Sequence, residues 1–180
     1  MNTYNFIEIY KTPKKLCDYL ISYHKKNKEH KVTGETSGGI NKEVKDSVDV
    51  YFFNQSQNKN IKIFFNTLTN CVSKYCKKYN ITENMRTYIV NHIQHYKPGG
   101  GYPSLHYERG SVMPKRILAY MLYLNTVTDK GGTEFPFQNV TLSATKGDLA
   151  LWPAEFTHPH KGIISPTQEK YIATGWFELI

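Results

Sequence analysis

Residues 116–124 read RILAYMLYL, a long apolar and aromatic run with the character of a β-strand. Further strand-like segments lie on both sides of it in the second half of the chain. Residues 88–96 alternate apolar and polar side chains, and shorter pieces cover residues 141–144, 148–152 and 171–177. The chain after about residue 86 is therefore expected to be rich in β-structure.

Turns with glycine or proline separate these segments. They are KPGGG at 97–101, DKGG at 129–132, KGD at 146–148 and ISP at 164–166. Helices followed by many short strands favour an α+β chain whose core is a β-sandwich or barrel.

Two amphipathic helices are expected before the strands. Thr12-Pro13 opens the first, with proline near its first turn. The second covers residues 59–79, where apolar side chains recur three and four positions apart. These repeating positions are Leu16, Tyr19, Leu20 and Tyr23 in the first helix, and Ile61, Phe64, Phe65, Leu68, Val72 and Tyr75 in the second.

The remaining N-terminal segments are shorter. Residues 4–10 alternate and predict a short strand, while residues 47–53 predict a strand or a helix edge. The polar stretch 33–47, with Gly38-Gly39, predicts a loop.

Length and composition indicate one cytosolic domain. The chain has 180 residues, of which 39% are hydrophobic and 21% charged. It contains no run of 18 apolar residues, so no membrane span is expected, and its N-terminus lacks the pattern of a secretory signal. Cys17, Cys71 and Cys76 are odd in number and form no CxxC pair, which predicts reduced thiols. A short chain of this kind is compatible with a viral or bacterial source.

The formal net charge is +8, and lysines crowd residues 11–31 and 42–78. Such a distribution suits an acidic partner or a nucleic acid. A lysine-rich solvated surface explains it equally simply, and we prefer that interpretation.

A candidate metal site follows the glycine-rich turn. His106-Tyr107-Glu108 is expected at the start of a strand, where residues i and i+2 share one face. His158 and His160 come about fifty residues later, next to another strand. Two histidines and one carboxylate on one side of a metal form the facial triad of non-haem Fe(II) oxygenases. His92 and His95 have no matching partners and are expected to be structural or solvent-facing.

A candidate anion site completes the pattern. Lys170 lies ten residues after His160, and a hairpin return of that length can bring it back beside the metal. In the Fe(II) oxygenases that use 2-oxoglutarate as co-substrate, this keto acid binds the iron through its 2-oxo and C1 carboxylate groups. A buried lysine requires an anionic partner, and the second carboxylate of 2-oxoglutarate, far from the iron, would supply it.

At these residues the chain resembles the Fe(II)- and 2-oxoglutarate-dependent dioxygenases, in particular the prolyl 4-hydroxylase-like branch. The resemblance covers roughly residues 86–180. It implies a distorted double-stranded β-helix, or jelly-roll, with supporting N-terminal helices packed on one sheet. The expected organisation is one domain, 1–180, with a helical support region at 1–85 and a catalytic core at 86–180.

The resemblance also implies roles for single residues. His106, Glu108 and His160 look like the iron ligands, and the ten-residue gap to Lys170 selects His160 over His158. Lys170 looks like the residue that anchors 2-oxoglutarate, with the Tyr123 hydroxyl assisting. Glu108 stands where the family usually has aspartate. The segments GGTEF at 131–135 and GDLALWP at 147–153 match family motifs, and the further pocket residues implied are Tyr96, Thr174 and Trp176.

The function implied is hydroxylation of a C–H bond with Fe(II), 2-oxoglutarate and O2, and with ascorbate as a further cofactor. A prolyl residue of a peptide or protein is the first expectation for the substrate. A nucleobase or a free amino acid is an alternative substrate. A non-catalytic jelly-roll that binds a metal or ligand, and a nucleic-acid-binding module, are alternative functions.

Overall fold

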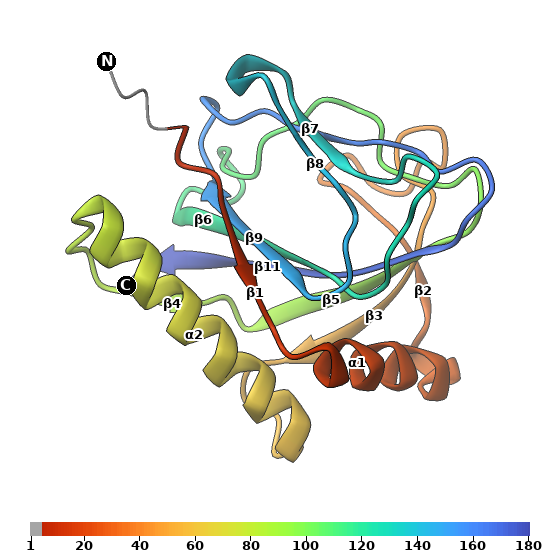
Figure 1. Ribbon diagram of the computed structural model, residues 1–180, viewed down its shortest axis with the longest axis horizontal. Coiled ribbons are helices and arrows are strands. Elements are labelled where there is room, and N and C mark those ends of the chain that lie inside the picture. The colour runs from red at the N-terminus through yellow and green to blue at the C-terminus, as the bar shows by residue number, and fades with distance from the viewer. Residues whose placement is uncertain (1–4) are drawn as a thin grey trace.

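The computed structural model describes residues 5–180, and within them the chain forms two α-helices and eleven β-strands (Figure 1). The N-terminal elements are β1 (Glu8–Lys11), α1 (Lys14–Lys26), β2 (Val32–Thr33), β3 (Val48–Phe53) and α2 (Lys59–Tyr79). The later elements are β4 (Met85–Thr87), β5 (Val90–Tyr96), β6 (Arg116–Tyr123), β7 (Thr133–Phe135), β8 (Val140–Leu142), β9 (Asp148–Pro153), β10 (Lys161–Gly162) and β11 (Lys170–Leu179).

The strands form two antiparallel sheets. The large sheet has the order β1-β9-β6-β11-β5-β3-β2, and β4 pairs with β11 beside this path. The small sheet has the order β10-β7-β8. Figure 1 shows the small sheet on one side of the large sheet and both helices on the other. The sequence left a β-sandwich and a β-barrel as alternatives. The described residues form a sandwich and do not close into a barrel.

The large sheet is buried on both faces, which explains the unbroken apolar run at its centre. In β6, Leu118, Tyr120 and Leu122 pack in the core shared with α1 and α2. The alternate residues Ala119 and Met121 pack in the second core, between the sheets. A strand covered on both sides has no solvent face, so it loses the polar alternation of a half-exposed strand.

The second helix begins and ends where its capping residues stand. The Asn58 side chain accepts hydrogen bonds from the backbone N–H groups of Asn60 and Ile61, and Asn80 ends the helix in the left-handed conformation. The predicted range of residues 59–79 is confirmed. The predicted N-terminal strand is found as Glu8–Lys11, and Tyr4, its predicted first residue, lies outside the described residues.

The predicted strand at His106-Tyr107-Glu108 is wrong. The structure has only an isolated bridge there, between His106 and His160. The pairing does not continue past the bridge, because the N–H groups of Glu108 and Arg109 donate to the carbonyl oxygen of Ala154. His106 and Glu108 nevertheless share one side of the segment.

No helix within residues 5–180 combines the length and apolar character needed to cross a membrane.

Candidate metal centre and co-substrate pocket

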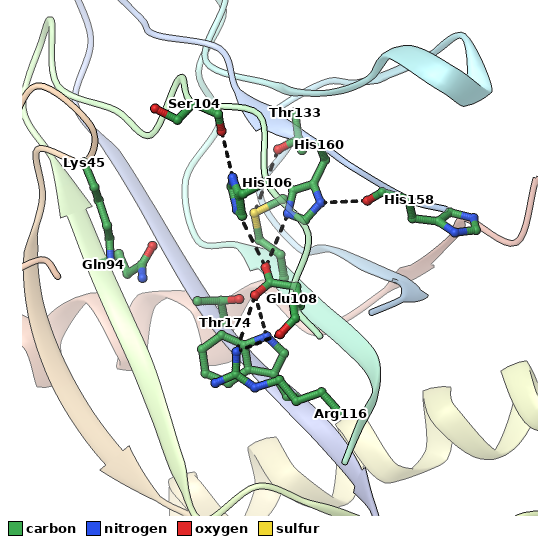
Figure 2. A network of polar contacts seen from close by, with 12 residues as sticks. Lys45, Gln94, Ser104, His106, Glu108, Arg116, Thr133, His158, His160 and Thr174 are labelled. Atoms are coloured by element: carbon green, nitrogen blue, oxygen red, sulfur yellow. Dashed lines mark hydrogen bonds and ion pairs between the residues drawn. The ribbon is translucent and has the colours of Figure 1, made fainter. Parts of the chain in front are cut away.

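His106, Glu108 and His160 bring three potential ligand atoms within 4.8 Å of one another. Figure 2 shows the two imidazoles and the carboxylate converging from separate segments. Nε2 of His160 lies 3.3 Å from Oε1 of Glu108, and Nε2 of His106 lies 3.8 Å from the same oxygen. His160 is buried and the other two residues are largely so. The arrangement therefore offers two nitrogens and one oxygen to a single point.

Backbone carbonyls fix the orientation of both imidazoles. Nδ1 of His106 is 2.8 Å from the carbonyl oxygen of Ser104, and Nδ1 of His160 is 3.1 Å from that of His158. Because a carbonyl only accepts, each Nδ1 carries a proton, and each Nε2 is left to face Glu108, where it can share a proton with the carboxylate or bind a metal. Burial lowers the pKa of His106, which favours the neutral form that binds metals.

The second oxygen of Glu108 is held from the opposite side. The indole Nε1 of Trp176 donates a 2.9 Å hydrogen bond to Oε2, and the guanidinium of Arg116 is 3.7 Å from that oxygen. Arg116 also lies over the Trp176 ring, 3.5 Å from its centre. Oε1 is therefore the oxygen that faces the histidines.

Glu108 is ionised at neutral pH. Burial alone would raise its pKa, but the hydrogen bond and charge of His160, with His106 and Arg116, lower it to about 2. A buried anion beside two imidazoles suits a divalent cation.

Lys170 is a buried cation in the same cavity. Its side chain is 5% exposed, and Nζ donates a 3.0 Å hydrogen bond to the carbonyl oxygen of Gly131. Burial lowers the pKa of Lys170 to about 8. Within residues 5–180, no carboxylate lies at ion-pair distance from this ammonium. It can therefore receive a carboxylate from a bound molecule.

Tyr96 and Thr174 line the cavity, whereas Tyr123 lies one layer behind its wall. The Tyr96 hydroxyl donates to Gln94 and the Thr174 hydroxyl to the carbonyl of Tyr120. The Tyr123 hydroxyl donates a 2.7 Å hydrogen bond to Oγ1 of Thr133.

Thr133 also lines the cavity, and its hydroxyl lies 3.9 Å from Sδ of Met121. The predicted contact of Tyr123 with 2-oxoglutarate stays a prediction. The residue that sequence reasoning missed here is Thr133, although it lies in the GGTEF motif.

His158 does not take part in the cluster. Its Nε2 bonds to the carbonyl oxygen of Asn5, 2.9 Å away, and Figure 2 shows its ring pointing away from His106. It lends only its carbonyl, which orients His160.

Of the two histidines expected to be structural or solvent-facing, His92 lines the cavity and its side chain is 18% exposed. His95, three residues further along β5 and on its opposite face, stacks its ring on Tyr171 at 4.2 Å and bonds to Glu169.

Two other contributors to the site were missed. The Tyr102 ring stacks on His106 with centres 3.9 Å apart, and Arg116 supports Glu108. Arg116 had one signal in the sequence, since it is the single charge at the start of an apolar strand.

The cavity that joins these groups has a volume of about 660 Å³. The three potential ligands and Lys170 all open into it, and Tyr96, Tyr102 and Trp152 are among the aromatic residues of its wall. A small dicarboxylate fits such a space between the metal ligands and the lysine.

Residues 91–178 match the family model of the 2OG-Fe(II) oxygenase superfamily. This segment is a 2OG-Fe(II) oxygenase domain. Enzymes with this domain use Fe(II), 2-oxoglutarate and O2, and the oxygenase domain here contains the whole His106, Glu108 and His160 cluster. No curated protein matches the sequence.

Solved structures share the fold of the oxygenase domain and its helices. A viral collagen prolyl hydroxylase from Paramecium Bursaria Chlorella virus-1, in a 2OG complex, is 18% identical with a TM-score of 0.75, and 98% of this chain and 97% of that chain are covered. A Pseudomonas putida prolyl-4-hydroxylase is 16% identical with a TM-score of 0.77, with 96% and 92% covered. A Trichoplax adhaerens prolyl hydroxylase in complex with a hypoxia inducible factor peptide fragment is 12% identical with a TM-score of 0.79, with 97% and 84% covered. The expected jelly-roll with supporting helices is confirmed.

The donor set of the oxygenase domain fits the metal and the co-substrate of its family. Neutral imidazole nitrogens and a carboxylate suit Fe(II), and an unpaired buried ammonium suits the far carboxylate of 2-oxoglutarate. Ascorbate stays a prediction.

Proposed function

We propose that this oxygenase hydroxylates a prolyl residue in a peptide or protein. The observation that carries the proposal is the union, in one cavity, of a His-Glu-His cluster and an unpaired buried lysine. The choice of a prolyl substrate is supported by the similar solved structures, which are prolyl hydroxylases.

In this proposal His106, Glu108 and His160 hold the iron. With Fe(II), 2-oxoglutarate and O2 bound, O2 would be the oxidant: one of its oxygen atoms would enter the substrate C–H bond, and the other would oxidise 2-oxoglutarate to succinate and CO2. Nδ1–H of His106 donates to the Ser104 carbonyl and Nδ1–H of His160 to the His158 carbonyl, so each histidine keeps its Nε2 lone pair for the metal. Trp176 and Arg116 hold Oε2 of Glu108 on the side away from the two histidines.

Lys170 binds and orients the co-substrate in the same proposal. Its ammonium pairs with the far carboxylate of 2-oxoglutarate. A carboxylate that replaces water around Lys170 satisfies two charges in a buried place.

The aromatic side chains at the cavity mouth suit a neutral, apolar ring. Tyr51, Tyr88 and Trp176 line this part of the wall. They offer apolar surface to a pyrrolidine ring and exclude water from the reacting carbon.

Turnover of 2-oxoglutarate tests the metal ligands. His106→Ala and His160→Ala should each abolish iron-dependent succinate formation, because a ligand nitrogen is lost. His158→Ala is the matched control, since its ring points away from the cluster and its backbone carbonyl remains. Undiminished succinate formation in the His106 or His160 variant would contradict the ligand assignment.

The substrate class is tested separately. Proline-containing peptides incubated with the protein, Fe(II), 2-oxoglutarate and ascorbate should gain the mass of one oxygen on a prolyl residue. Oxidation of free amino acids or nucleobases in place of the peptides would overturn the prolyl assignment and leave the oxygenase chemistry in place.

A further inference from the structure

His92, on strand β5, lines the same cavity as the potential metal ligands. Alternation along β5 directs His92, Gln94 and Tyr96 into the cavity and Ile93 into the helix-side core. In the sheet, His92 is paired with Tyr51 of β3 on one side and with Thr174 of β11 on the other. His92 is therefore flanked by a paired strand on each side.

The ring of His92 is held by its neighbours. It meets Tyr51 edge-on at 4.7 Å and Trp176 edge-on at 5.6 Å. Trp176 is the residue that donates to Glu108, so one aromatic ring separates His92 from the metal cluster. A group bound to His92 therefore lies next to the reacting position.

A buried carboxylate lies behind His92. Asp49 is 1% exposed, and it accepts hydrogen bonds from Ser47 at 2.7 Å and from the Lys45 ammonium at 3.1 Å. The neighbouring His92 and Lys45 lower the pKa of Asp49 despite its burial. The carboxylate is therefore ionised and its Oδ2 is 3.7 Å from Nδ1 of His92.

The Asp49 charge selects one tautomer of His92. Nδ1 is buried and has no hydrogen-bond partner within residues 5–180, and the anion facing it favours a proton there. The neutral ring then carries its lone pair on Nε2, at the outer edge. The side chain is 18% exposed and this edge is the part that reaches the cavity.

We propose that His92 positions the peptide substrate, with Nε2 accepting a hydrogen bond from the backbone N–H of a residue beside the target proline. This inference rests on the proposed function. Proline itself has no N–H, so the bond recognises the flanking residue and distinguishes a peptide from an isolated ring. His92 acts on position only and takes no part in the oxidation.

Two variants test the nitrogen separately from the ring. His92→Phe keeps the edge-on packing with Tyr51 and Trp176 but has no acceptor. His92→Gln keeps an acceptor at similar reach. With a peptide of alternating alanine and proline, His92→Phe should raise KM about five- to tenfold with a small change in kcat, as expected for one lost hydrogen bond. His92→Gln should recover part of this loss.

Succinate formation without peptide controls for damage to the metal site. It should be the same in wild type, His92→Phe and His92→Gln, because none of these changes touches a proposed ligand or Lys170. A parallel loss of this uncoupled activity would assign the effect to the metal centre and overturn the positioning role.

The substrate provides the second half of the test. Lactic acid in place of each alanine replaces the peptide N–H by an ester oxygen. Wild type should lose about as much in kcat/KM with this ester as His92→Phe loses with the amide, and His92→Phe should lose little more. If the ester substitution lowers kcat/KM by the same factor in wild type and in His92→Phe, His92 does not accept this hydrogen bond and the assignment is overturned. If wild type forms succinate but hydroxylates no prolyl peptide, the proposed function itself fails, and this inference with it.

Discussion

At the scale of single residues, the two oxygens of Glu108 have different surroundings. Oε1 faces both histidines, while Oε2 is held by the Trp176 indole and lies near Arg116. A glutamate in this place has one more methylene than the aspartate usual in the family. The tryptophan hydrogen bond restrains the longer side chain, and so explains how Glu108 stays aimed at one point.

Trp176→Phe should weaken metal binding by about tenfold or more, because it removes this donor and leaves most of the ring. Titration with Fe(II) or Co(II) under nitrogen measures the effect. Thermal unfolding of the metal-free variant is the control, since a general loss of structure would lower the melting temperature as well. An unchanged metal affinity would show that Arg116 alone is enough to orient Glu108.

Lys170 predicts a pH dependence of 2-oxoglutarate binding. Its pKa in the unliganded protein is about 8, so the ammonium is charged below that pH and increasingly neutral above it. Affinity should be flat up to about pH 7.5 and then fall, approaching tenfold per pH unit well above pH 8.

Lys170→Arg is the matched variant, because a guanidinium stays charged throughout this range. Its affinity should be lower in absolute terms but should not fall with pH, as followed by calorimetry. A wild-type affinity that stays constant to pH 9.5 would contradict a role for the Lys170 charge.

Sequence reasoning reached His106, Glu108, His160 and Lys170 because each lies in a short local pattern with a fixed spacing. It did not place Thr133 or His92 in the cavity, because their positions depend on strand register. Tyr51, His92 and Thr174 lie in one row only after β3, β5 and β11 have paired. No local pattern in the sequence contains that pairing.

At the scale of elements, the second helix was predictable and the segment that contains His106 was not. The repeat of apolar residues over 59–79 and the capping Asn58 act within one helix, so local rules apply. The residues from His106 to Glu108 have the alternation of a strand, but His106 bonds to His160 whereas Glu108 bonds to Ala154, six residues earlier, so no regular ladder forms.

The helix α2 should contribute strongly to stability through one face. Leu68→Ala should lower the free energy of unfolding by about 2–5 kcal/mol, because Leu68 is 1% exposed in the core under the large sheet. Ile63→Ala, on the exposed face of the same helix, should change it by less than about 1 kcal/mol. Urea denaturation followed by circular dichroism measures both, and similar losses would contradict the packing described.

At the scale of the whole molecule, the site joins parts of the chain that are far apart. The N-terminal 85 residues supply Asp49 and Tyr51 as well as both helices, and the remaining strands supply the potential ligands and Lys170. We propose that the chain folds as one domain, in which the helices support the sheet that contains the cavity.

Ligand binding should therefore stabilise the entire fold. The experiment excludes oxygen and uses Fe(II) and 2-oxoglutarate each at about 100 times its Kd. Each ligand then adds about 2.7 kcal/mol to the free energy of unfolding, which raises Tm by roughly 5–10 °C per ligand. Scanning calorimetry of wild type and His160→Ala gives the comparison. The variant should gain little from the metal, and an equal gain would locate the metal elsewhere.

The reciprocal backbone bridge between His106 and His160 has one more consequence. Their N–H and C=O groups pair in both directions, at 3.0 and 2.9 Å, without any contribution from the side chains. These backbone hydrogen bonds therefore hold the two histidine ligands at a fixed spacing before a metal ion binds. The two segments lose little conformational freedom on metal binding, so the metal-free protein keeps the arrangement that binds the ion again.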